Sequence, residues 1–197
     1  MKTDTPISVQ LMHADPVVNI GLKALCDSLT GLNLCLDDDA LSAAPSQTVL
    51  IADYRCGLEL QRQFSSDEVS ILIVTHFDKE GQIRQALRAG VRGYVLQSCV
   101  LQELEPALLA MSCGRNYISS RADRAIANSW YRADLTGRET DVLQLLGKGH
   151  CNKLIARELG LAEETVKTHL KNVMSKLNVS ARVQAVVVAN ERGLLAN

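Results

Sequence analysis

The order of apolar and polar residues changes its period along the 197-residue chain. Up to Leu96, short apolar or β-rich runs alternate for the most part with stretches of helical pattern. This alternation predicts a doubly wound α/β domain, in which a parallel sheet is covered by helices on both faces and any site lies at the carboxyl ends of the strands. The five predicted strands are Ile7 to Met12, Leu32 to Leu36, Val49 to Ala52, Ile71 to Val74 and Gly93 to Leu96.

A helical period replaces this alternation in the last third of the chain. Thr136 and Glu139 have the spacing of a capping box just before an apolar run, which predicts a helix that begins near Gly137. Asn152 is then placed to cap a second, short helix, and Gly160 is placed to end it. The pattern therefore predicts short helices joined by tight turns.

A third predicted helix, which begins three residues after Gly160, has one apolar stripe and one polar face. At 3.6 residues per turn the stripe gathers Val166, Leu170, Val173 and Leu177. The opposite face carries Glu164, Lys167, Thr168, Lys171 and Ser175. Two helices joined by a tight turn, the second of which exposes cationic and hydroxyl side chains, form what a helix-turn-helix needs to enter a major groove.

Residues 135–185 resemble the DNA-binding domain of LuxR-type regulators, the four-helix module of the NarL/FixJ response regulators. The resemblance implies contacts to bases and nearby backbone for Lys167, Thr168 and Lys171, and contacts to phosphates for Asn152, Lys153 and Thr165. It also implies that the helix after Ser180 dimerises. The chain departs from the family at Cys151 and Ala162, where the family usually has serine at a helix start, and losing such a cap costs about 1 kcal/mol.

Charge is distributed unevenly between the two regions. The whole chain has a net charge of −1, but residues 135–197 contain nine Lys and Arg against six Asp and Glu, which gives +3 and leaves −4 for the remainder. A basic C-terminal region agrees with DNA binding. Because the excess is modest, we expect tight binding to need two copies on two half-sites, and therefore a homodimer on double-stranded DNA.

The N-terminal region is similar to the receiver domain of response regulators, a flavodoxin-like fold. The similarity runs from about Ile7 to Asn116. It implies that Asp53 occupies the phosphoacceptor position, Thr75 the switch hydroxyl position and Tyr94 the switch aromatic position.

Several positions of the receiver pocket depart from the family pattern. Receivers place two acidic residues after the first strand to hold Mg²⁺, but the matching residues are His13 and Ala14, and the lysine expected after the fifth strand is Gln97. Phosphoryl transfer to a carboxylate needs a cation to neutralise the transferring group, and Mg²⁺ is usually held by one or two carboxylates. A one-residue deletion in the loop could bring Asp15 nearer the pocket. The pattern predicts a pseudo-receiver.

Two connections of this region are abbreviated. Between Leu36 and Val49 there is room for only a turn or two of helix, so the second helix of the receiver is predicted to be truncated. The segment after Asp53 lacks the Pro-Gly stretch that usually follows the acceptor. There, Arg55 could form an ion pair with Asp53 that mimics a neutralised pocket, although exposed pairs contribute little.

Several other classes of protein are disfavoured. The six cysteines form no CxxC pair and the four histidines have no metal-ligand spacing. We find no nucleophile–base pair and no phosphate-cradling glycine loop, so we expect no enzyme, no metal site and no cofactor. The N-terminus has no charged-then-apolar leader and no apolar run is long enough to cross a bilayer, which predicts a cytoplasmic protein without membrane contact.

The sequence thus predicts a receiver-like domain (1–116), a linker or linker helix (117–134) and a LuxR-type helix-turn-helix domain (135–197). The expected function is that of a sequence-specific, DNA-binding transcriptional regulator, an atypical response regulator that acts as a homodimer without aspartyl phosphorylation. Two alternatives stay open. One is an adaptor that docks onto or heterodimerises with another regulator. The other is a ligand-sensing regulator that uses the receiver-like domain. Trp130 and Tyr131, just before the DNA-binding domain, are interpreted as an interdomain contact and not as a ligand cage.

Overall fold

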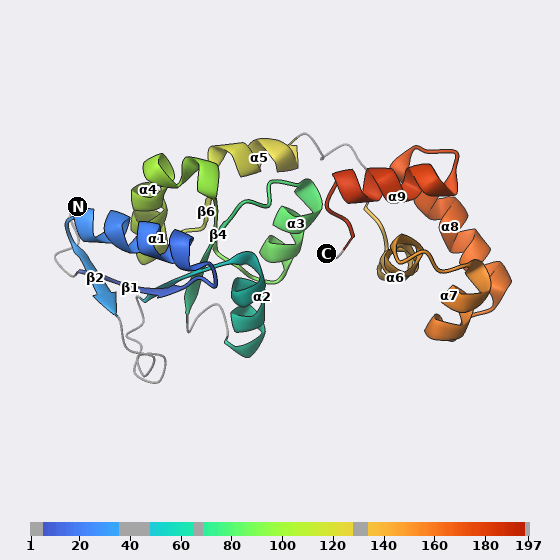
Figure 1. The fold of residues 1–197 in the computed structure, drawn as a ribbon, viewed down its shortest axis with the longest axis horizontal. Coiled ribbons are helices and arrows are strands. Elements are labelled where there is room, and N and C mark those ends of the chain that lie inside the picture. The colour runs from blue at the N-terminus through green and yellow to red at the C-terminus, as the bar shows by residue number, and fades with distance from the viewer. Residues whose placement is uncertain (1–5, 36–47, 65–68, 128–133, 196–197) are drawn as a thin grey trace. The chain divides into compact units, whose positions relative to one another are not determined.

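The structure is a computed structural model that describes residues 6–35, 48–64, 69–127 and 134–195 (Figure 1). The chain forms two compact units, one built mainly from residues up to Ala125 and the other mainly from Ile126 onward. Each unit has its own hydrophobic core, and each is described by itself. Trp130 and Tyr131 lie outside the described residues.

The first unit contains an entirely parallel sheet in the order β2-β1-β3-β4-β5-β6. Its strands are β1 (Ile7–Met12), β2 (Leu32–Cys35), β3 (Val49–Ala52), β4 (Ser70–Thr75), β5 (Gly93–Leu96) and β6 (Tyr117–Ile118). The five predicted strands are confirmed. β4 is one residue longer at each end than predicted, and the predicted last residue of β2, Leu36, lies outside the described residues. All four residues of β3 are buried, as expected for a strand covered on both faces.

The predicted number of strands, five, is wrong by one. Tyr117 and Ile118 form a sixth strand, in register with Gly93 and Tyr94 of β5. A strand of two residues is too short to show the alternation by which strands are recognised in a sequence. Both residues fall in the predicted linker (117–134), but they extend the sheet.

Helices cover both faces of this sheet (Figure 1). On one face, α1 (Pro16–Ser28) and α4 (Val100–Ser112) pack over a core that includes Val9, Ile51 and Leu72. On the other, α2 (Tyr54–Gln63) packs against β3 and β4. The remaining helical elements are α3 (Glu80–Arg88), the short 3-10 helix η2 (Gln97–Cys99) and α5 (Ser120–Ala127). The helix predicted to be truncated falls within 36–47, outside the described ranges.

One close approach holds α2 against the sheet. A Cβ atom on Gly57 would lie 2.6 Å from Cγ1 of Ile73, so only glycine fits without a shift of its neighbour. The N–H of Gly57 donates to the backbone carbonyl of Asp53 (2.8 Å), which directly follows β3. The packing of α2 thus fixes Asp53 at the carboxyl end of a central strand.

The second unit consists of four helices in the described residues: α6 (Gly137–Gly147), α7 (Asn152–Leu159), α8 (Glu163–Leu177) and α9 (Arg182–Glu191). The all-α, four-helix architecture predicted for this region is confirmed. Its core combines apolar residues of all four helices, among them Val142, Ile155, Val173 and Ala189. None of the helices in the described ranges combines the length and apolar character that crossing a membrane requires.

Local signals explain most of the helix ends in this unit. The predicted capping box is present, because the Glu139 carboxylate accepts the N–H of Thr136 (2.7 Å) and Thr136 Oγ1 accepts the N–H of Glu139 (3.3 Å). Gly160 ends α7 in the left-handed conformation, with φ of 65°. The prediction that Asn152 caps α7 is wrong. Cys151 is the cap residue, without a side-chain hydrogen bond, and Asn152 is the first residue of the helix.

Candidate nucleic-acid interface

Helix α8 separates an apolar stripe from a polar, cationic face. Its stripe is between 0% and 7% exposed and consists of Val166, Leu170, Val173 and Leu177. The three side chains predicted to meet bases, Lys167, Thr168 and Lys171, are all exposed. The fold therefore brings them together on one accessible surface of one helix.

The two lysines of this face differ in their surroundings. Lys167 Nζ donates to a carboxylate oxygen of Glu164 one turn away (2.9 Å), and this hydrogen bond and the charge of Glu164 raise the pKa of Lys167. Thr168 Oγ1 donates to the backbone carbonyl of Glu164 (3.1 Å). Among the residues that the structure describes, Lys171 has no hydrogen-bond or ion-pair partner. Lys171 can therefore engage a ligand without first breaking a contact.

The three residues predicted to hold phosphates lie in the first turns of helices. Asn152 and Lys153 begin α7, and Thr165 is the third residue of α8. The first N–H groups of a helix have no partner within the helix, and the helix dipole makes this end attractive to anions. The caps of both helices, Cys151 and Ala162, provide no side-chain hydrogen bond that would occupy those groups.

Arg182, at the start of α9, was not identified from the sequence. Its Nη1 donates to Oδ1 of Asn152 (2.9 Å) and its Nη2 donates to the backbone carbonyl of His150. A cavity of about 290 Å³ is lined by Leu146, Asn152, Lys167, Leu170, Met174 and Arg182. The only available signal in the sequence was a cation at the first position of a helix, where the dipole disfavours it.

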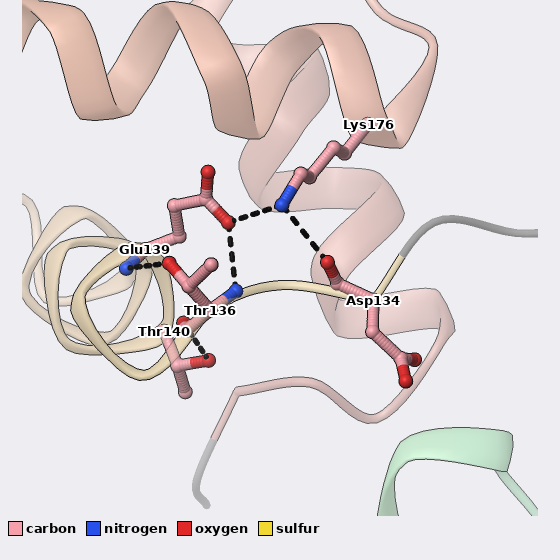
Figure 2. A network of polar contacts seen from close by, with 5 residues as sticks. All are labelled: Asp134, Thr136, Glu139, Thr140 and Lys176. Atoms are coloured by element: carbon pink, nitrogen blue, oxygen red, sulfur yellow. Dashed lines mark hydrogen bonds and ion pairs between the residues drawn. The ribbon is translucent and has the colours of Figure 1, made fainter.

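A polar network holds the beginning of α6 against the end of α8 (Figure 2). Lys176 Nζ donates to Glu139 Oε2 (2.7 Å) and to the backbone carbonyl of Asp134 (2.9 Å). Glu139 is 3% exposed. Burial by itself would raise the pKa of Glu139, but the hydrogen bonds from Lys176 and Thr136 outweigh burial and lower it. The network joins the start of α6 to the last turn of α8.

Asp53 acts as the N-cap of α2 in the first unit. Its Oδ1 accepts the backbone N–H groups of Arg55 (2.9 Å) and Cys56 (3.0 Å), and its Oδ2 accepts that of Ala14 (3.0 Å). Burial tends to raise the pKa of Asp53, but these backbone hydrogen bonds and the nearby His13 lower it. Both carboxylate oxygens are therefore bonded to the protein's own backbone.

His13 and Asp15 are also occupied by backbone contacts. The buried His13 donates from Nε2 to the carbonyl of Val74 (3.2 Å), while its Nδ1 accepts the N–H of Asp15 (3.1 Å). Asp15 caps α1 through the N–H groups of Val17 and Val18. Mg²⁺ needs oxygen ligands with free lone pairs, and a site is usually built around one or two carboxylates. The side chains of His13, Asp15 and Asp53 therefore do not fit a magnesium site.

The suggested ion pair between Arg55 and Asp53 is not formed. Arg55 Nε instead pairs with Glu59 Oε1 (3.2 Å), one helical turn further along α2. Residues four apart on a helix face the same side, and Arg55 points into solvent with its side chain 89% exposed. Only the backbone N–H of Arg55 reaches the Asp53 carboxylate.

The positions matched to the receiver switch meet at Phe77. Thr75 Oγ1 accepts the N–H of Phe77 (3.3 Å), and the hydroxyl of the fully buried Tyr94 donates to the Phe77 carbonyl (2.8 Å). Burial raises the pKa of Tyr94. Gln97, in η2, lines a different space, a cavity of about 590 Å³ between α1 and α4. The structure therefore groups Thr75 with Tyr94, and His13 and Ala14 with Asp53.

Comparisons with known sequences place the chain near bacterial regulators. Residues 133–189 match the family model for bacterial regulatory proteins of the luxR family. The transcriptional regulatory protein YxjL of Bacillus subtilis is 30% identical, over 96% of this chain and 97% of its own length. The response regulator protein VraR of Staphylococcus aureus is 32% identical, over 74% of this chain and 73% of its own. The transcriptional regulatory protein DesR of Bacillus subtilis is 31% identical, over 71% and 69%.

Comparison with solved structures identifies the same kind of fold. The response regulator RcsB of Salmonella typhimurium superposes with a TM-score of 0.64 over 93% of this chain and 99% of RcsB, at 21% identity. At that identity the similarity supports the fold and no residue-level function.

Proposed function

The chain belongs to the LuxR family of bacterial response regulators and is a DNA-binding transcriptional regulator, and we propose that it acts as a homodimer on double-stranded DNA without phosphorylation of Asp53. The observation that carries the proposed contact is the exposed face of α8, where Lys167, Thr168 and Lys171 stand opposite a buried apolar stripe. In a helix-turn-helix this is the face that can enter the major groove.

In the proposed complex the two groups of residues have different tasks. Side chains on the face of α8 meet base edges, which carry the sequence information. Asn152, Lys153 and Thr165, in the first turns of α7 and α8, hold phosphates and so set the register of the protein on the duplex. Lys167 must exchange its contact with Glu164 for one with DNA. This function needs no catalytic group, and it takes place in the cytoplasm, where bacterial DNA lies.

The proposed homodimer follows from charge and from exposed apolar residues. A net charge of +3 over residues 135–197 gives one copy only a modest attraction for DNA, so two copies that bind two half-sites together are needed for tight binding. On α9, Val183 and Val187 are 73% and 50% exposed, whereas Ala185 and Ala189 are buried. Exposed valines on a helix whose opposite side is anchored in the core by Ala185 and Ala189 suit a contact with a second copy.

We expect Val183→Asn to reduce cooperative binding to a two-half-site operator by roughly tenfold, because a polar group would be buried in the dimer contact. Binding to an isolated half-site should change little. The measurement is a titration of both DNAs by fluorescence anisotropy. Val17→Asn, which alters an equally exposed valine on α1 (78%), is the matched control. Equal losses on both DNAs would show that Val183 does not mediate pairing, and a cooperative loss confined to Val17→Asn would move the dimer contact to the first unit.

Independence from phosphorylation is proposed from the geometry around Asp53. A phosphoryl group bonds to one carboxylate oxygen, and both oxygens are already engaged, Oδ1 by the N–H groups of Arg55 and Cys56 and Oδ2 by that of Ala14. Neither His13 nor Ala14 can supply the carboxylates that usually hold Mg²⁺, and Gln97 cannot supply the positive charge of a lysine. In this proposal Asp53 is a structural cap that joins the β1–α1 loop to α2.

We expect untreated full-length protein to bind the DNA upstream of its own gene. Beryllofluoride with Mg²⁺ should change that affinity by no more than about twofold, which is less than the loss of a typical hydrogen bond would cause. Asp53→Asn, which retains an oxygen for the cap, should also leave the affinity unchanged. Asp53→Ala should cost the first unit about 1 kcal/mol of stability through the lost cap, while DNA affinity persists. The affinities are to be measured at one fixed salt concentration.

Two results would contradict this proposal. The first is DNA binding that requires the phosphoryl mimic. The second is a large loss of affinity in Asp53→Asn while circular dichroism shows an intact fold. The first would make Asp53 a working acceptor, and the second would make it an acceptor or a structural switch.

A further inference from the structure

Arg182 occupies a position that does not favour its own helix. It is the first residue of α9, where the positive end of the helix dipole disfavours a cation. Its guanidinium is instead used elsewhere, at the connection between α6 and α7 and at the start of α7. The reason for an arginine at this place must therefore lie in those contacts.

The contacts of Arg182 fix the orientation of the Asn152 side chain. The planar guanidinium donates through Nη1 to Asn152 Oδ1 (2.9 Å) and through Nη2 to the carbonyl of His150. Because two donors on one rigid plane bind two acceptors, Asn152 is held relative to the backbone that precedes it. Rotating the amide by half a turn would point its NH₂ group at the guanidinium, donor against donor. Arg182 therefore selects one of the two amide orientations.

This orientation leaves the NH₂ group of Asn152 as the part of the amide that can act on a ligand. The cavity beside it has an apolar floor made by Leu146, Leu170 and Met174, and its polar groups are Asn152, Lys167 and Arg182. An amide NH₂, an ammonium and a guanidinium are all hydrogen-bond donors. In the free protein Lys167 is paired with Glu164, and Arg182 is bonded to Asn152 and His150, so the NH₂ group of Asn152 is the donor left for an anion such as a backbone phosphate of DNA.

We propose that Arg182 is a positioning residue for DNA binding, which holds the Asn152 amide so that its NH₂ group donates to a phosphate of the DNA backbone. The inference rests on the proposed function, and it adds to the DNA interface a residue that was not identified from the sequence. Asn152 touches the phosphate, and Arg182 acts through Asn152.

The test is a double-mutant cycle of Arg182→Gln and Asn152→Ala in the full-length protein, with operator affinity measured over a range of salt concentrations. Each single variant should bind about tenfold more weakly, as for the loss of one hydrogen bond to a charged group. The double variant should bind no more than about twofold more weakly than the weaker single one, because both changes remove the same contact. The salt dependence should stay that of the wild type, since neither change removes a charge that touches a phosphate.

Two controls separate positioning from a merely structural role. Asn152→Asp keeps the oxygen that accepts from Arg182 but replaces the NH₂ group with a negative charge, so it should lose operator binding while its thermal midpoint does not fall. Arg157→Gln removes an exposed cation from the last turn of α7, and its effect should add to that of Asn152→Ala.

Each other result has a definite meaning. Additive losses in the cycle, or Asn152→Asp protein that binds as tightly as the wild type, would overturn the inference. A salt slope reduced by about one in Arg182→Gln would make Arg182 a direct phosphate contact and overturn its positioning role. Failure of the wild type to bind its operator in any state would overturn the proposed function and this inference together.

Discussion

Lys171→Ala is expected to weaken binding to the operator by roughly 1 to 3 kcal/mol and to relax the preference at one base position. Lys171 is exposed on the face of α8. Among the described residues it has no hydrogen-bond or ion-pair partner in the free protein. Nothing therefore offsets the loss of its contact with a base edge. Competition binding with operators that vary one position at a time measures both effects.

Lys167→Ala is the matched comparison for this prediction. In the free protein Lys167 is paired with Glu164 (2.9 Å), so DNA gains the lysine only after that pair is broken. We therefore expect a smaller loss for Lys167→Ala than for Lys171→Ala. If Lys171→Ala weakens all sequences equally and reduces the salt slope by about one, Lys171 contacts a phosphate and reads no base.

Lys176→Met is expected to destabilise the second unit by about 2 to 3 kcal/mol. Methionine replaces the apolar stem of the lysine but leaves the buried carboxylate of Glu139 without its cation (Figure 2). Adding Glu139→Gln should recover part of the loss, because glutamine still accepts the N–H of Thr136 and carries no charge to bury. Urea unfolding followed through amide resonances of α6 and α8 reports on this unit alone.

The effect of Lys176→Met should also depend on pH. Because hydrogen bonds lower the pKa of Glu139 in the folded protein, its contribution to stability is present above about pH 4.5 and is lost as pH falls through the folded pKa. The stability difference between wild type and Lys176→Met should therefore be largest near neutral pH and shrink in acid. A difference that stays constant with pH, or that is absent at pH 7, would mean that water already solvates Glu139.

How much of this structure could be predicted from the sequence depends on how far apart the interacting residues are along the chain. The capping box of Thr136 and Glu139 and the end of α7 at Gly160 were predictable, since each signal lies within four residues of its effect. The strands were recognisable because each one carries a short apolar or β-rich run, which is fully buried in β3 and β5 and only partly buried in β2. The two-residue β6 has no such pattern, and its place comes only from pairing with β5.

The same difference between local and long-range contacts applies to the candidate interface. Periodicity alone places Lys167, Thr168 and Lys171 on one face of α8, and the structure agrees about their exposure. No local rule links Lys176 to Glu139 or Arg182 to Asn152, because these partners are 37 and 30 residues apart and meet only after the helices pack. The proposed pairing of Arg55 with Asp53 was wrong because Glu59, four residues further along α2, lies on the same side of the helix as Arg55 and pairs with it.

His13 has a consequence for what replacing it by an aspartate would do to the first unit. Its ring joins β1 to β4 by donating to the carbonyl of Val74, and it supports the start of α1 by accepting from Asp15. An aspartate at this position could not donate to Val74, and leaving a buried carbonyl unbonded costs about 1 to 3 kcal/mol. His13→Asp alone is therefore expected to destabilise the first unit. The side chain at this position thus contributes to the scaffold of the first unit, since it ties two strands and a helix start together.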